Sequence, residues 1–256
     1  MKTMMSKPVR VIVLAFSVFA TFNAKSAESF GGGDVKKGNL SISVSDKGVI
    51  DAVSVNGIRI LGTNGGISTS GSPKDEWQPW CPQMWGRDIK VEKTDTADCT
   101  TITTTGVMKP KDVEGQNNFK TVIKVYADKI VFTAKIDTSV KDLWKRCGGS
   151  FRLDAANFAN AKFRADGGEW KDVPEARGNR NLLWPENAAV LDVKGGKYLA
   201  TFKFDGIKTH FFDERKGEKP VLMLEYNSPQ QEFSDERGNK NYGAEFSVTV
   251  SLKEDK

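Results

Sequence analysis

Histidine is almost absent from this chain of 256 residues, in which His210 is the only one. That scarcity excludes the zinc-protease helix and any site built from two or three histidines. A serine triad would have to use His210, yet no G-x-S-x-G turn presents a nucleophilic serine. The two glycine-rich phosphate-binding motifs, G-x-x-x-x-G-K-[ST] and G-x-G-x-x-G, are missing as well. We therefore expect no metal and no cofactor.

A hydrophobic run long enough to cross a membrane is also missing. The apolar stretch from Val11 to Phe22 has about 12 residues, whereas a membrane-spanning helix needs roughly 20. Three basic residues precede this stretch and small residues follow it up to Ala27, which is the layout of a signal peptide. We expect residues 1–27 to be removed, no stable membrane span, and a periplasmic or extracellular location.

The mature chain has no excess of charge of one sign. The signal segment carries four of the 38 basic residues and no acidic one, which leaves 34 basic residues against 33 acidic ones. Nucleic-acid binding usually needs a basic excess or stripe, so we expect no nucleic-acid partner. Residues 28–38 are rich in glycine and lysine and predict a flexible lead-in to a single domain over residues 39–256. No feature predicts an oligomeric state.

Helical periodicity is scarce, and alternation of apolar and polar residues takes its place. Leu40, Ile42 and Val44 alternate with serines, which is typical of a half-buried strand. Asn56-Gly57 separates two alternating runs and favours the type I′ turn of a hairpin. Similar short runs recur to the end of the chain, between turns rich in Gly, Asn and Asp. The pattern predicts an all-β fold, an antiparallel β-sandwich of about a dozen strands with little helix.

Cysteine is scarce too, and the three residues Cys81, Cys99 and Cys147 allow at most one disulfide. A pair between Cys81 and Cys99 would close the shorter loop and is slightly favoured. Three buried thiols are the alternative.

Tryptophan, by contrast, is concentrated between residues 75 and 88. Exposed indole rings stack on the apolar face of a sugar, and nearby polar groups bond its hydroxyls. The candidate sugar-binding residues of this loop are Trp77, Trp80, Trp85, Arg87 and Asp88. Burial of the rings in a small satellite core is the alternative.

A second aromatic and charged stretch follows at residues 169–186. It contributes the candidate binding residues Trp170, Arg180 and Trp184, which could form another wall of a cleft. Glu175 and Glu186 are candidates for a general acid and base.

His210 is the third candidate catalytic residue. Its unperturbed pKa lies near neutrality, so it would be the natural general base. A packed histidine in an alternating strand is the alternative.

Residues Gly48 to Leu61 resemble the opening hairpin of galactose-mutarotase-like supersandwiches found in bacterial glycan-degrading proteins. The resemblance implies a broad sheet that faces a sugar. The epimerases of that family use paired histidines and a glutamate, and this chain departs from them because it has His210 alone.

These features favour an exported carbohydrate-binding or glycan-processing accessory domain whose partner is an oligo- or polysaccharide. A polysaccharide lyase or glycoside hydrolase is one alternative. A non-catalytic structural or interaction domain of the cell envelope is another. The sequence leaves open whether the protein is an enzyme.

Overall fold

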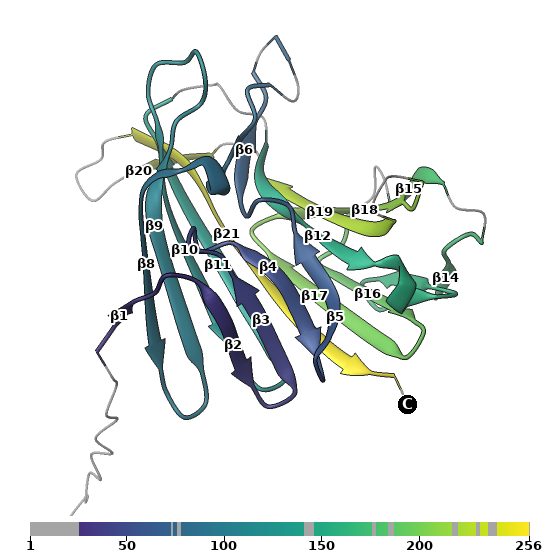
Figure 1. Ribbon diagram of the computed structural model, residues 1–256. Helices are drawn as coiled ribbons and strands as arrows, with labels where there is room; N and C mark the ends of the chain where they lie inside the picture. Colours follow the sequence, from purple (N-terminus) through teal and green to yellow (C-terminus); the bar gives the residue numbers. More distant parts are fainter. Residues whose placement is uncertain are drawn as a thin grey trace, which may run out of the picture.

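The fold consists of two antiparallel β-sheets, as Figure 1 shows for this computed structural model. The structure describes residues 26–72, 74–75, 78–140, 146–175, 178–183, 187–216, 220–228, 231–234 and 240–255. Within them the non-strand elements are two short 3-10 helices, η1 (Gln83–Trp85) and η2 (Ala155–Phe158). The all-β sandwich predicted from alternation is confirmed.

One sheet has eleven strands. In spatial order these are β1 (Glu28–Ser29), β8 (Arg87–Asp95), β9 (Thr100–Met108), β10 (Asn117–Val125), β11 (Lys129–Thr138), β21 (Lys240–Glu254), β17 (Tyr198–Asp205), β16 (Val190–Gly195), β13 (Lys162–Ala165) and β14 (Lys171–Asp172), with β20 (Gln231–Ser234) paired to β21.

The other sheet has ten strands. Its order is β15 (Asn179–Leu183), β18 (Lys208–Glu214), β19 (Val221–Ser228), β12 (Arg146–Asp154), β5 (Ile58–Thr63), β4 (Ile50–Val55), β3 (Leu40–Val44) and β2 (Gly33–Lys37), with β6 (Ser68–Ser70) paired to β12 and to β7 (Cys81–Pro82).

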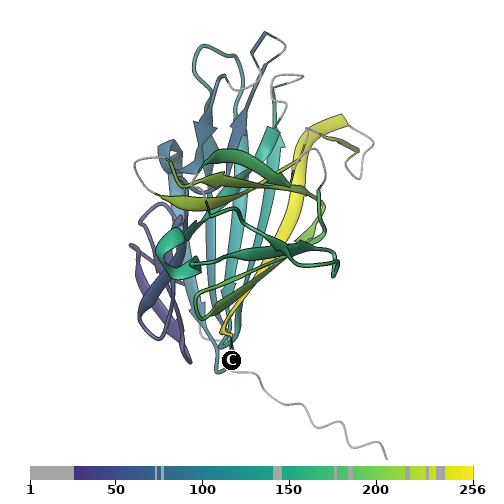
Figure 2. The same cartoon turned by 90° about the vertical axis from the view of Figure 1, so that its right-hand side faces the viewer.

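The core lies between the two sheets. Figure 2 shows β18 and β19, in olive green, running across the teal strands of the eleven-stranded sheet. Aromatic rings meet between the layers: Phe151 of β12 lies 5.6 Å from Phe202 of β17, and Tyr226 of β19 lies 5.9 Å from Phe246 of β21, between ring centroids. Each inward ring comes from an alternating strand, so its neighbours in the chain point outward.

The Asn56-Gly57 hairpin is confirmed. β4 and β5 pair across this turn, and Asn56 and Gly57 both have positive φ, at 52° and 80°. A type I′ turn requires positive φ at both central positions.

The segment expected to be a flexible lead-in contains two strands. β1 pairs with β8, and β2 pairs with β3 over five residues. Val35 of β2 is buried because its side chain reaches the core. The glycine- and lysine-rich sequence did not predict β2, because an edge strand with one inward residue shows little alternation of apolar and polar residues.

The described residues form twenty-one strands, more than the expected dozen, because several of these strands have only two to four residues. Such short pieces carry too few alternating positions to be recognised. Residues 1–25 of the predicted signal peptide lie outside the described residues. No helix in the described part of the chain is both long and apolar enough to cross a membrane.

All three cysteines are free, which corrects the preference for a Cys81–Cys99 disulfide. Cys81 of β7 and Cys147 of β12 both pair with Thr69 of β6, so the strand β6 lies between the two cysteines. Neighbouring strands are about 4.8 Å apart, so these two Cα atoms are too distant for a disulfide. Burial raises the pKa of the Cys81 thiol to about 11.

Candidate functional site

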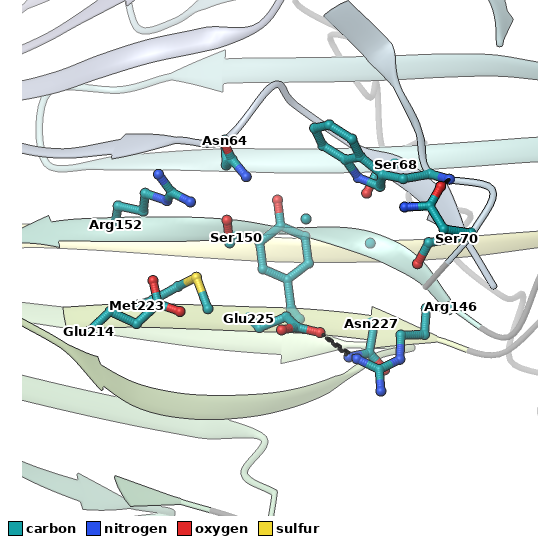
Figure 3. Close-up of a pocket in the computed structure, with 15 residues that line it drawn as sticks. Asn64, Ser68, Ser70, Arg146, Ser150, Arg152, Glu214, Met223, Glu225 and Asn227 are labelled. Carbon is teal, nitrogen blue, oxygen red and sulfur yellow. Dashed lines mark hydrogen bonds and ion pairs between the residues drawn. The ribbon is translucent and has the colours of Figure 1, made fainter. Parts of the chain in front are cut away.

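A cavity of about 450 Å³ opens on the outer face of β12, β18 and β19, and Figure 3 shows its lining. Polar side chains dominate this lining, together with one indole ring. The lining residues are Asn64, Ser68, Ser70, Gln78, Trp80, Arg146, Gly148, Gly149, Ser150, Arg152, Glu214, Met223, Glu225, Tyr226 and Asn227.

Strand alternation explains why polar groups face the cavity. Along β19, Leu222, Leu224 and Tyr226 are buried in the core, so Glu225 and Asn227 point to the opposite face. Residues directly opposite each other in antiparallel strands share a face. This pairing joins Ser150, Glu225 and His210 into one row across β12, β19 and β18.

Glu225 is a half-buried carboxylate of the cavity lining, and it forms an ion pair with Arg146. Its Oε1 lies 3.3 Å from Arg146 Nη1 and accepts a hydrogen bond from Asn227 Nδ2 at 3.0 Å. Only 18% of the Glu225 side chain and 17% of the Arg146 side chain are exposed. Burial raises the pKa of the Glu225 carboxyl, Arg146 opposes this shift, and the negative charge of Glu214 adds to it.

Arg152 brings a second guanidinium to the same cavity. Figure 3 shows it near Ser150 and Asn64, at the end away from Arg146. The side chain is half-buried and its Nε is shielded from solvent.

Two consecutive glycines let β12 pass close to Tyr226. A Cβ atom on Gly148 would collide with the Tyr226 carbonyl oxygen. A Cβ atom on Gly149 would come within 2.8 Å of Tyr226 Oη and 2.9 Å of the Gly66 carbonyl oxygen. Glycine at both positions therefore shapes the floor of the cavity.

The tryptophan-rich loop contributes one ring to the cavity. Trp80 is half-buried and lines it beside Gln78. Trp85 lies edge-on to Trp80, with 4.9 Å between ring centroids and an interplanar angle of 72°. It is 61% exposed, and it is not among the lining residues. Trp77 lies outside the described residues.

The other predicted binding residues lie elsewhere. Arg87 and Asp88 are exposed at the start of β8, in the eleven-stranded sheet. The Trp170 ring already has two cations over it, since Arg164 Cζ lies 4.6 Å and Lys194 Nζ 4.5 Å from its centroid. These contacts compete with stacking of a sugar on Trp170.

Arg180 is placed by its backbone alone, opposite Asp213 in the β15–β18 pair. Nothing in the structure describes its side chain. Trp184 and Glu186 lie outside the described residues.

Neither His210 nor Glu175, the two predicted catalytic residues that the structure describes, lines the cavity. His210 lies in the row of Glu225, but its side chain is only 8% exposed and does not line the cavity. Glu175 is exposed and lines a different hollow of about 600 Å³, beside η2 and Arg215. The carboxylate directly opposite His210 in the strand pairing is Glu225.

Sequence analysis missed Arg146, Arg152 and Glu225, and the signals for them were weak. The glycine pair of β12 marks a close backbone approach inside a strand, between the two arginines. Glu225 is the single charged residue of an otherwise apolar run, Val221 to Tyr226. In the described residues, no cluster of three His, Cys, Asp or Glu side chains could hold a metal ion.

No protein-family model matches the sequence, and no curated protein sequence matches it. Solved structures do match. The galactose 1-epimerase of Lactobacillus acidophilus NCFM aligns with 87% of this chain and 93% of its own, at a TM-score of 0.58 and 9% identity. The chain has the galactose-mutarotase-like fold.

Two further solved structures agree with this fold. A putative aldose 1-epimerase from Escherichia coli K12 covers 87% of this chain and 99% of its own, at a TM-score of 0.55 and 10% identity. An α-N-acetylgalactosaminidase from Bifidobacterium bifidum, in complex with GalNAc, matches 86% of this chain with 36% of its own, at a TM-score of 0.58 and 7% identity. The galactose-mutarotase-like fold expected from the Asn56-Gly57 hairpin is confirmed.

Proposed function

We propose that this protein is an exported carbohydrate-binding protein that holds a sugar in the cavity on β12, β18 and β19. The observation that carries the proposal is the lining itself, in which one indole ring accompanies hydroxyl, amide, carboxylate and guanidinium groups. Binding sites usually join flat apolar surface to a few oriented polar groups. A sugar ring stacked on Trp80 would place its hydroxyls toward Ser150, Asn227 and Glu225.

The fold supports a carbohydrate ligand by analogy. The matched structures are named as sugar epimerases and as a glycosidase bound to GalNAc. A fold hosts many functions, so the weight of the proposal rests on the cavity.

Binding should be tested on residues 28–256, with a glycan array and then affinity gels of the polysaccharides retained. Trp80→Ala should weaken retention by about tenfold, because it removes the one indole among the described residues of the lining. Trp170→Ala is the matched control, since that ring lies outside the cavity. Lack of retention of the wild type on every glycan, or equal retention of folded Trp80→Ala, would contradict the proposal.

The second candidate function is sugar chemistry, as a polysaccharide lyase or glycoside hydrolase. The specific observation is that two carboxylates, Glu214 and Glu225, line one cavity and that Glu225 has a raised pKa. Raised carboxyl pKa values suit a general acid. His210 lies in the same row as Glu225.

Turnover distinguishes the two functions. Incubation with a panel of polysaccharides should be followed by the absorbance of unsaturated products and by reducing ends. An enzyme would lose turnover in Glu225→Gln by at least about a hundredfold, whereas a binding protein would show no turnover in the wild type. A wild type with neither binding nor turnover would point to a structural domain of the envelope.

A further inference from the structure

Arg152 is a half-buried cation that forms no ion pair with any residue in the described part of the chain. Its Nε is shielded from solvent and has no hydrogen-bond partner, and no ion pair joins its guanidinium to any residue that the structure describes. Other half-buried arginines are paired: Arg164 lies 2.7 Å from Asp192 and Arg215 lies 2.8 Å from Asp213. A buried donor without an acceptor destabilises the folded protein, so its presence calls for an explanation.

The surroundings of Arg152 direct this guanidinium to the cavity. Its partners across the strands are Met223 of β19 and Gly62 of β5, and neither has a charged side chain. Figure 3 shows the guanidinium near Ser150 and Asn64, which are neutral.

The acids of the cavity leave Arg152 available. Glu225 is engaged by Arg146 and Asn227. Glu214 forms no ion pair with Arg152 within the described part of the chain. Arg152 is therefore the guanidinium of the lining that can neutralise a charge on a ligand.

We propose that the ligand is an acidic saccharide whose anionic group binds Arg152. The inference rests on the proposed carbohydrate function and names its substrate class. A carboxylate of a uronic acid matches the planar fork of a guanidinium with two parallel hydrogen bonds, and a sulfate ester offers the same acceptors. Ser150 and Asn64 supply neutral donors beside that group. Arg146 and Glu225, at the other end, meet the neutral hydroxyls.

The test compares acidic glycosides with neutral parents that differ from them at C6 alone. Isothermal titration of residues 28–256 uses methyl glucuronide and methyl galacturonide against methyl glucoside and methyl galactoside, with the 6-sulfates of both neutral glycosides as further arms. The acidic member of at least one pair should bind about tenfold or more tightly than its neutral parent. The carboxylate and sulfate arms identify the anionic group.

Variants assign the preference to Arg152. Arg152→Gln should bind acidic and neutral members equally while keeping the neutral affinity, and Arg152→Lys should recover part of the preference because it keeps the charge without the fork. Lys120→Gln removes an exposed charge from β10, in the other sheet, and should change nothing. Circular dichroism verifies that each variant is folded.

Three results would overturn the inference. The first is neutral binding that is as tight as, or tighter than, acidic binding in every pair, which rejects the acidic substrate class. A preference that survives in folded Arg152→Gln rejects the role of Arg152. Failure of every glycoside and every glycan to bind rejects the carbohydrate function itself, and the acidic substrate class with it.

Discussion

At the scale of single residues, the absence of a side chain at Gly149 helps to shape the candidate site. Gly149 leaves room for Tyr226 Oη beneath β12, and the ring of Tyr226 packs in the core against Phe151 and Phe246. The tyrosine therefore cannot move aside without disturbing the packing between the sheets.

Gly149→Ala is expected to lower the free energy of unfolding by about 1–3 kcal/mol, because the new methyl group overlaps Tyr226 Oη and the Gly66 carbonyl oxygen. Urea denaturation measures the change. Gly31→Ala is the control, since no atom lies within 4 Å of a Cβ atom there. Equal effects at both positions would show that the close approach to Tyr226 does not matter.

Glu225 gives the cavity a pH-dependent contribution to stability. Burial raises the pKa of its carboxyl in the folded protein, whereas the unfolded chain ionises at the ordinary pKa. Between these two pKa values the folded state binds more protons, so the free energy of unfolding falls as the pH rises. At lower pH the carboxyl is protonated in both states and this loss is absent.

As the pH is raised from about 4 to about 7, the free energy of unfolding should therefore fall less for Glu225→Gln than for the wild type. Denaturation curves at both pH values give the difference for each protein. The absolute stability of the variant is not the test, since Arg146 loses its partner. An equal or larger loss in Glu225→Gln would contradict the raised pKa.

At the scale of elements, the ten-stranded sheet ends in a strand, β2, that the sequence pattern did not predict. β2 covers the edge of β3, Val35 adds to the core, and Lys37 Nζ donates to the Thr96 carbonyl oxygen at 2.8 Å. This last contact links β2 to the turn between β8 and β9 of the other sheet.

A protein that starts at Asn39 should be less stable than one that starts at Glu28, by about 2 kcal/mol, because Val35 leaves the core. It should also aggregate more readily, since the edge of β3 becomes exposed. Thermal denaturation and light scattering measure both effects. Identical melting temperatures would restore the view of residues 28–38 as a flexible lead-in.

Local alternation predicted the central elements well. In runs such as Val53 to Ile60, the alternation of apolar and polar residues shows which side chains face the core. Asn56-Gly57 adds a turn that requires positive φ at both residues. The cavity could not be predicted in this way. Arg146 and Glu225 are 79 residues apart, and only the pairing of β12 with β19 brings them together.

At the scale of the whole molecule, the proposed location depends on residues 1–27. Expression of the full chain in a bacterial host should release a protein that begins near Glu28 into the periplasmic fraction. N-terminal sequencing after osmotic shock checks this outcome.

Leu14→Arg interrupts the apolar run and should leave the uncleaved chain in the cytoplasm, because a shortened run no longer serves as a signal. Lys2→Arg keeps the positive charge of the start and should be exported normally. Cytoplasmic, uncleaved protein from the unchanged chain would refute the export signal.

The sequence by itself determined the fold class, the Asn56-Gly57 hairpin and the near-neutral charge of residues 28–256, because alternation, turn chemistry and composition are local or additive properties. Only the tertiary structure decided which polar residues meet. The register of β12, β19 and β18 placed Ser150, Glu225 and His210 in one row, whereas Glu175, which lies outside these strands, lines another hollow. Strand pairing depends on residues far apart in the chain, so no single segment carries that information.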